Sequence, residues 1–122
     1  GKGLAIIPDE GIVYAPFDGE VVTVYPSKHA IGLRSDTGVE ILVHIGLDTV
    51  QLNGQHFESF VESGQAIRVG DPLIRFDIEQ IKQAGYDVVT PIIVTNTASY
   101  LDVLPTYQGT VEPSRDVLRI LV

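Results

Sequence analysis

The chain of 122 residues contains no cysteine, no methionine and no tryptophan. Without cysteine it can form neither disulfides nor a thiolate nucleophile, and such a composition suits the cytoplasm. Positive charge is also scarce, because 8 Lys and Arg residues stand against 16 Asp and Glu residues, for a formal net charge of −8. No basic run with interleaved aromatic residues occurs, which argues against nucleic-acid binding. The acidic balance instead favours a partner with a basic surface.

Long hydrophobic runs are missing as well. No apolar segment approaches the roughly 18 residues that a membrane-spanning helix needs, and no signal peptide is visible. Yet 44% of the residues are hydrophobic, which indicates a soluble globule that buries a core. The length fits one domain. Gly1 is expected to mark a domain boundary rather than a native N-terminus.

Short β-rich runs separated by glycine turns dominate the chain and predict an all-β sandwich or barrel. Asp77 is expected to cap a short helix, with Gln80 as its capping-box partner and Gly85 as its stop. Residues 57–61 are ambiguous between a strand and a helical turn, and residues 51–54 are expected to form a turn or strand end. The expected strands cover residues 4–8, 12–14, 20–25, 64–71, 72–76, 91–95 and 117–122.

Residues 27–50 predict a β-hairpin around the turn Ser35–Gly38. If Ser35 faces Gly38, antiparallel pairing places His29 directly opposite His44. Opposed residues on one face have Cβ atoms about 4.5–5.5 Å apart, so the two imidazoles would meet. A slip of one residue would place them on opposite faces of the sheet.

Two facing histidines limit the available chemistry, although a purely structural pair is an equally open interpretation. Metal binding needs a third ligand that His29 and His44 do not supply locally. Acyl transfer has little support, because no Ser-His-Asp spacing occurs. Attack on phosphorus by one neutral imidazole, helped by a hydrogen bond from the other, fits the pair.

Several neighbours of the pair are candidate site residues. Asp48 either accepts a hydrogen bond, meets a basic partner or is a solvated turn residue. Ser27 and Thr49 either orient an imidazole, donate to a phosphoryl oxygen or merely supply strand polarity. Gly46 marks a close approach of a ligand or another backbone segment. His56, in a polar loop, is expected to be exposed and passive.

The apolar residues near the pair alternate, so half of them should face the core and half should surround the histidines. An exposed apolar patch that bears two polar groups is typical of a docking surface. The residues concerned are Tyr25, Ile31, Leu42, Val43, Ile45 and Leu47.

The segment from Gly38 to Val50, with His44 in its centre, resembles the signature of the enzyme IIA domain of the glucose-type sugar phosphotransferase system. The resemblance covers almost the whole chain, and it implies that the N-terminal segment usual in the family has been trimmed before Gly1. Further matching segments, at the family's spacing, are Gly3–Pro8, Ala15–Gly19, His29–Ala30, Gly64–Gln65, Val69–Asp71, Phe76–Asp77 and Thr90–Pro91.

This resemblance implies an antiparallel β-sandwich with one or two short helices, and a phosphocarrier function. His44 would accept a phosphoryl group from the phosphohistidine of HPr and pass it to a cysteine on a IIB domain of a sugar permease. His29 would hydrogen-bond the phosphoryl group and be needed for onward transfer. Ser27 stands where the family commonly has Thr, which retains a hydroxyl. Asp48 matches a family acidic residue near the partner's basic surface.

The resemblance also implies which cofactors and partners the domain uses and where it works. No cofactor is required; zinc would bind His29 and His44 only at a partner interface, with a third ligand from the partner. The expected partners are HPr, a IIB domain and regulatory proteins, without nucleic acid. The domain would be cytoplasmic, and would meet the membrane only through the permease.

Three rival interpretations stay open at this point. A zinc-dependent hydrolase on a related β fold would need a third ligand, for which His56 is a poor candidate. A lipoyl- or biotinyl-type carrier is suggested by residues 64–76, but the comparable hairpin tip Ser35–Gly38 lacks the lysine that such a carrier displays. A regulatory binding module is compatible with phosphotransfer. No P-loop glycine pattern is present, which argues against ATP as the donor.

Overall fold

A computed structural model describes residues 3–95, which form two β-sheets with one α-helix and one 3-10 helix. The strands are short, as the glycine-rich sequence predicts. In chain order the elements are β1 (Gly3–Ile6), β2 (Ile12–Tyr14), β3 (Gly19–Val24), β4 (Ala30–Ser35), β5 (Glu40–His44), η1 (Thr49–Leu52), β6 (Phe57–Ser59), β7 (Ala66–Ile67), β8 (Pro72–Phe76), α1 (Ile78–Gln83) and β9 (Thr90–Val94).

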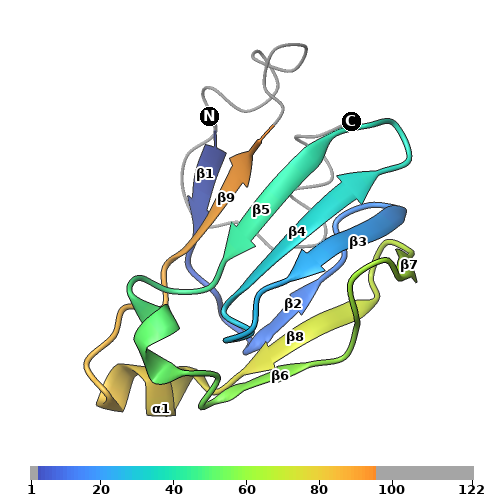
Figure 1. The fold of residues 1–122 in the computed structure, drawn as a ribbon. Helices are drawn as coiled ribbons and strands as arrows, with labels where there is room; N and C mark the ends of the chain where they lie inside the picture. The colour runs from blue at the N-terminus through green and yellow to red at the C-terminus, as the bar shows by residue number, and fades with distance from the viewer. Residues whose placement is uncertain (1–2, 96–122) are drawn as a thin grey trace.

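The larger sheet has six strands in the order β1-β9-β5-β4-β3-β7, and the smaller has three in the order β2-β8-β6. Every pairing in both sheets is antiparallel. Buried side chains from both sheets form one hydrophobic cluster between them. The expected antiparallel all-β fold with a short helix is therefore confirmed. In Figure 1, β5 ends and β4 begins at the end of the large sheet where α1 lies.

The alternation of burial along β4 and β5 fixes which side chains face the core. Ile31 and Leu33 on β4, and Ile41 and Val43 on β5, are at most 2% exposed. His44 belongs to the other, half-buried set of β5 positions. Its imidazole is therefore on the face of the sheet turned away from the core.

Most expected strands lie within one or two residues of the observed ones. The exceptions are residues 64–71, where only Ala66–Ile67 pair, and residues 57–61, which resolve as the strand Phe57–Ser59. The expected turn or strand end at 51–54 is in part the 3-10 helix Thr49–Leu52. The expected last strand, 117–122, lies outside the described residues.

The predicted cap of α1 is confirmed only in part. Asp77 accepts a hydrogen bond from the backbone N–H of Gln80, and Gly85 follows the helix with φ of 93°. The reciprocal bond of a capping box is absent, because the N–H of Asp77 donates to the carbonyl of His56. Asp77 thus ties the helix to the loop that follows η1.

The predicted register of the β4–β5 hairpin was wrong by one residue. Ala30, not His29, pairs with His44, and the N–H of Ser35 donates to the carbonyl of Val39. The expected turn bond from Gly38 N–H to the Ser35 carbonyl does form. However, Gly38 has φ of 95°, which adds one residue to the loop as a bulge before β5.

Candidate functional site

The two histidines meet despite the shifted register, because each stands where regular strand geometry ends. His44 is the last residue of β5, and His29 precedes β4 directly after Lys28, whose φ is 59°. The ring centroids of His29 and His44 are 5.0 Å apart, with the ring planes at 78°. The strict alternation of side chains holds only within a strand, so the one-residue slip did not separate the rings. The expected meeting of the imidazoles is confirmed.

The loop after β5 holds the His44 ring in a single orientation. Nδ1 of His44 lies 2.8 Å from the carbonyl oxygen of Gly46. A carbonyl oxygen only accepts hydrogen bonds, so Nδ1 must carry the proton and donate it. The neutral ring then presents an unprotonated Nε2, whose lone pair is the nucleophilic site of imidazole.

Gly46 is required at its position on two grounds. Its φ is 77°, and a Cβ there would lie 2.7 Å from the carbonyl oxygen of Asp87 and 2.6 Å from Cγ2 of Thr49. The N–H of Leu47 donates to the same Asp87 carbonyl at 3.0 Å. The sequence-based expectation of a close backbone approach at Gly46 is confirmed, and the approaching backbone is that of Asp87.

His29 is held differently from His44. Its residue is 5% exposed, and its Nδ1 is a buried nitrogen without a hydrogen-bond partner among the described residues. Burial, and in second place the nearby His44, lower the pKa of the His29 imidazole below its usual value of 6.5. His29 is therefore neutral near pH 7 and can donate one hydrogen bond without carrying a full positive charge.

The other sequence-predicted site residues occupy distinct places around the pair. Thr49 is fully buried, and its hydroxyl donates to the carbonyl of Ile45, so it braces the loop instead of facing either imidazole. Direct donation from Thr49 to a phosphoryl oxygen is not supported by this geometry. Asp48 is exposed and has φ of 61°. Ser27 is half-buried in the turn between β3 and β4.

Only part of the expected apolar surface is exposed. Tyr25 and Leu47 are 38% and 44% exposed, whereas Ile31, Val43 and Ile45 are buried in the core. Val50, three residues beyond Leu47, is 48% exposed and was not expected from the sequence. Val50 lies in a short helical turn after β5, where side chains no longer alternate between two faces, so its exposure could not be predicted from the sequence pattern.

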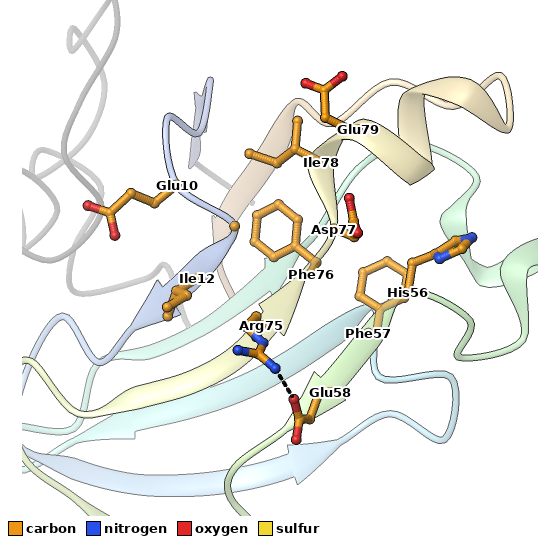
Figure 2. A pocket seen from close by; sticks show the side chains of 11 residues that line it. Glu10, Ile12, His56, Phe57, Glu58, Arg75, Phe76, Asp77, Ile78 and Glu79 are labelled. Carbon is orange, nitrogen blue, oxygen red and sulfur yellow. Dashed lines mark hydrogen bonds and ion pairs between the residues drawn. The ribbon is translucent and has the colours of Figure 1, made fainter.

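A cavity of about 730 Å³ lies elsewhere, between β2, β6, β8 and α1, and its lining includes neither His29 nor His44. His56 lines it with φ of 74°, and it is half-buried rather than exposed as the sequence predicted. Figure 2 shows His56 beside Phe57, with the ion pair between Arg75 and Glu58 apart from it. The cavity is thus separate in its residues from the paired histidines.

Within residues 3–95, no group of three or more His, Cys, Asp or Glu side chains could hold a metal ion. The paired histidines supply two ligands, which is one fewer than a catalytic zinc site takes from its protein. Nothing in the described part of the chain therefore favours the zinc hydrolase.

A model of the family described as phosphoenolpyruvate-dependent sugar phosphotransferase system, EIIA 1, matches residues 1–100. The chain belongs to this EIIA family. It is 52% identical over 120 residues, or 98% of its length, to the PTS system beta-glucoside-specific EIIBCA component of Bacillus subtilis. It is 55% identical over 97 residues, or 80% of its length, to the PTS system glucose-specific EIIA component of Staphylococcus epidermidis.

The fold of this EIIA domain also matches a solved structure, glucose permease IIA from Mycoplasma capricolum. The TM-score is 0.77 at 44% sequence identity, covering 82% of this chain and 65% of that one. The curated relatives are longer: this chain spans 20% of the Bacillus subtilis protein and 58% of the Staphylococcus epidermidis protein. As a member of the EIIA family, the chain is a component of the phosphoenolpyruvate-dependent sugar phosphotransferase system. Within residues 3–95 no helix is long and apolar enough to cross a membrane.

Two features of the paired-histidine site were not predicted from the sequence. The carbonyl of Gly46 selects the protonated nitrogen of His44, and the ring of Tyr25 packs edge-on against His29 at 5.9 Å. Every residue type carries a backbone carbonyl, so the sequence does not show which carbonyl accepts a hydrogen bond from a side chain. Tyr25 was noted only as an apolar neighbour, although its place four residues before His29 across a Pro-containing turn was a usable signal.

Proposed function

We propose that Nε2 of His44 accepts a phosphoryl group from the phosphohistidine of HPr and passes it to a cysteine of a IIB domain. The observation that supports this most is the bond from His44 Nδ1 to the Gly46 carbonyl, which leaves the lone pair of Nε2 free. In the first step Nε2 attacks phosphorus as the nitrogen–phosphorus bond of the donor breaks. In the second step a thiolate attacks, and the electron pair returns to Nε2.

His29 is the hydrogen-bond donor to the transferred group. Because none of the described residues offers an acceptor to its buried Nδ1, a proton there would lack a hydrogen bond, so the neutral ring carries its proton on Nε2. A neutral donor stabilises the negative phosphoryl oxygens less than an imidazolium would. A carrier that must release its phosphoryl group benefits from this weaker hold, since positioning and charge stabilisation govern phosphoryl transfer.

The surrounding residues take supporting roles in the proposal. Exposed Asp48 meets a basic surface of the partner, and the exposed side chains of Leu47 and Tyr25 provide apolar contact area. Thr49 stabilises the loop through its bond to the Ile45 carbonyl, and Ser27 keeps a hydroxyl near the start of β4. Zinc would need a ligand from a partner in addition to His29 and His44.

The relatives suggest the setting of this chemistry. Their names include both an EIIBCA component and an EIIA component, so EIIA units occur with and without B and C parts. We propose that residues 1–122 form one IIA domain that works in the cytoplasm and meets the membrane through a sugar permease. Regulatory proteins that bind the same face would be further partners.

The test is phosphorylation by phosphoenolpyruvate, enzyme I and HPr, with wild type, His44→Gln, His29→Gln and His56→Gln compared. We expect wild type and His56→Gln to be labelled and to pass the label to a IIB domain. His44→Gln should take up no label, because the nucleophile is gone. His29→Gln should be labelled but should transfer onward at least about 10²-fold more slowly.

The chemistry of the label gives an independent check. A phosphoramidate is hydrolysed by acid and survives alkali, whereas phosphoserine and phosphothreonine survive acid. An acid-stable label, or full labelling of His44→Gln, would refute the assignment of His44.

A further inference from the structure

The turn between β3 and β4 brings Tyr25 against His29 through its own backbone. The N–H of Lys28 donates to the carbonyl of Tyr25 at 2.8 Å, and the N–H of Tyr25 donates to the carbonyl of Ala30 at 3.1 Å. Pro26 fixes φ at the position after Tyr25, and Lys28 adopts φ of 59°. The same closed turn therefore carries both Tyr25 and His29.

Three aromatic rings form a row on this turn and the end of β5. The rings of Tyr25 and His29 have centroids 5.9 Å apart with planes at 76°, and those of His29 and His44 are 5.0 Å apart at 78°. Both contacts are edge-to-face, the arrangement that aromatic quadrupoles favour. Tyr25 is 38% exposed whereas His29 is 5% exposed. The His29 ring in the middle of the row is therefore covered, and the Tyr25 ring at one end faces solvent.

His29 lacks the hydrogen bond that fixes the orientation of His44. Nδ1 of His44 is bonded to the Gly46 carbonyl, but Nδ1 of His29 is buried without a partner in the part of the chain that the structure describes. A rotation of the His29 ring by a half turn would exchange its nitrogen and carbon positions without losing any hydrogen bond at Nδ1. A single ring orientation therefore requires a contact other than a hydrogen bond at Nδ1, and Tyr25 packs directly against the ring.

We propose that Tyr25 is a positioning residue, whose ring holds the His29 imidazole in the single orientation that aims its Nε2–H at the phosphoryl group on His44. This role rests on the proposed function, because it concerns how His29 serves onward transfer. Tyr25 itself contacts no reacting atom. The ring rather than the hydroxyl of Tyr25 makes the contact, so phenylalanine should replace it.

The first test observes the isolated domain by histidine-selective ¹⁵N NMR, which is tractable because the chain has only three histidines. Wild type, Tyr25→Phe, Tyr25→Ala and Val69→Ala are compared; Val69 is a 47% exposed apolar residue on the loop between β7 and β8. We expect one tautomer of His29 in wild type, Tyr25→Phe and Val69→Ala. Tyr25→Ala should show averaged ring nitrogens for His29 only. Unchanged His29 signals in Tyr25→Ala would overturn the proposal.

The second test measures transfer from the phosphorylated domain to a IIB domain. Loss of one edge-to-face contact corresponds to about a twofold to tenfold effect, and we expect that loss in kcat for Tyr25→Ala with full rescue by Tyr25→Phe. A loss confined to KM would make Tyr25 a docking residue only, and an equal defect in Tyr25→Phe would assign the effect to the hydroxyl.

Two further readouts keep the tests decisive. If Tyr25→Ala does not fold, nuclear Overhauser effects between the Tyr25 and His29 rings of wild type decide, and their absence overturns the proposal. If wild type takes no phosphoryl group from HPr, the proposed function fails. The NMR comparison of the isolated domain still reports whether Tyr25 orders His29, so the two failures are distinguishable.

Discussion

In the mechanism proposed above, a single backbone carbonyl, that of Gly46, gives two chemically identical side chains different roles. It fixes the proton of His44 on Nδ1 and leaves the lone pair of Nε2 free, whereas Nδ1 of His29 has no hydrogen-bond partner among residues 3–95. Burial also lowers the pKa of His29. The difference between acceptor and donor thus comes from surroundings rather than from residue type.

The lowered pKa of His29 predicts how stability depends on pH. The unfolded chain binds a proton at this residue once the pH falls to about 6.5, while the folded chain resists protonation. Between the folded pKa and about 6.5, the free energy of unfolding therefore rises with pH. Urea unfolding from pH 7.5 to 5.5 should show a shallower slope for His29→Gln than for wild type.

His56→Gln is the matched control for this measurement, because it removes an imidazole that lies away from the pair. It should retain the wild-type slope. A His29→Gln slope equal to that of wild type would contradict the burial of an uncharged His29.

At the scale of residues, the sequence predicted the histidine pair but not the hydrogen bond that decides which nitrogen of His44 is protonated. His29 and His44 could be singled out because few residue types serve as nucleophile and donor. The protonated nitrogen could not be predicted, since it depends on a carbonyl two residues away in a loop. Thr49 was a candidate for orienting an imidazole or donating to a phosphoryl oxygen, but its hydroxyl donates to the carbonyl of Ile45.

Among the elements, the loop between β5 and η1 carries the site. Its residues are tied to three neighbours: Ile45 N–H donates to the His29 carbonyl at 2.7 Å, Leu47 N–H to the Asp87 carbonyl, and the Thr49 hydroxyl to the Ile45 carbonyl. The loop is thus braced both within itself and against the segment before β9. These bonds hold the Gly46 carbonyl beside Nδ1 of His44.

Gly46→Ala should break this loop, whereas Gly64→Ala should not. Gly46 has φ of 77° and Gly64 has φ of 89°, but a Cβ at Gly46 meets Asp87 and Thr49, whereas a Cβ at Gly64 has no atom of the described residues within 4 Å. The backbone cost alone is about 1–2 kcal/mol, and the clash adds about 1–3 kcal/mol at Gly46. Denaturant unfolding measures both variants.

Phosphoryl uptake in the two glycine variants separates stability from function. Folded Gly46→Ala should be labelled more slowly, because the Gly46 carbonyl is displaced, and Gly64→Ala should be labelled like wild type. Equal destabilisation of the two variants would argue against the crowding at Gly46.

The hairpin shows what local sequence signals can and cannot fix. The turn residues Ser35–Gly38 were correctly placed, and the bond that closes them forms. The register was missed because Gly38 adopts positive φ and adds a residue, a choice that turn composition alone leaves open. Strand-end geometry at His29 and His44 then brought the rings together in spite of the error.

On the scale of the whole molecule, the antiparallel sandwich presents the site at one end of the large sheet (Figure 1). The β4–β5 hairpin turn lies at the opposite end of the two strands from His44. With a net charge of −8, the chain attracts a basic partner over several ångströms, but local charge decides where that partner docks.

Asp48→Asn should slow phosphoryl uptake from HPr by about twofold to fivefold at low salt, because it removes an exposed charge beside the site. Asparagine tolerates the left-handed φ of 61° at this position, so the loop should keep its shape. Stopped-flow or quench measurements of uptake at 0.05 and 0.5 M NaCl check this, and the difference should shrink at high salt.

Asp36→Asn provides the control, since it removes the same charge from the exposed turn at the other end of the hairpin. It should leave uptake nearly unchanged. Equal slowing by the two variants would show that net charge matters and that Asp48 has no local role.

The fold class was the most predictable property, because short β-rich runs between glycine turns leave few alternatives. The division into six and three strands was not predictable, since β7 has only two residues and pairs at an edge. The exposed apolar residues near the pair were half predictable: Leu47 was among the alternating residues named from the sequence, but Val50 lies within the helical turn η1, where alternation ends.

The most direct measurement is heteronuclear NMR of the phosphorylated, ¹⁵N-histidine-labelled domain, in which coupling to ³¹P identifies the bonded nitrogen. We expect phosphorus on Nε2 of His44, with its Nδ1 proton still bonded to the Gly46 carbonyl. Phosphorus on Nδ1 of His44, or on His29 or His56, would contradict the proposal that Nε2 of His44 is the phosphoryl acceptor.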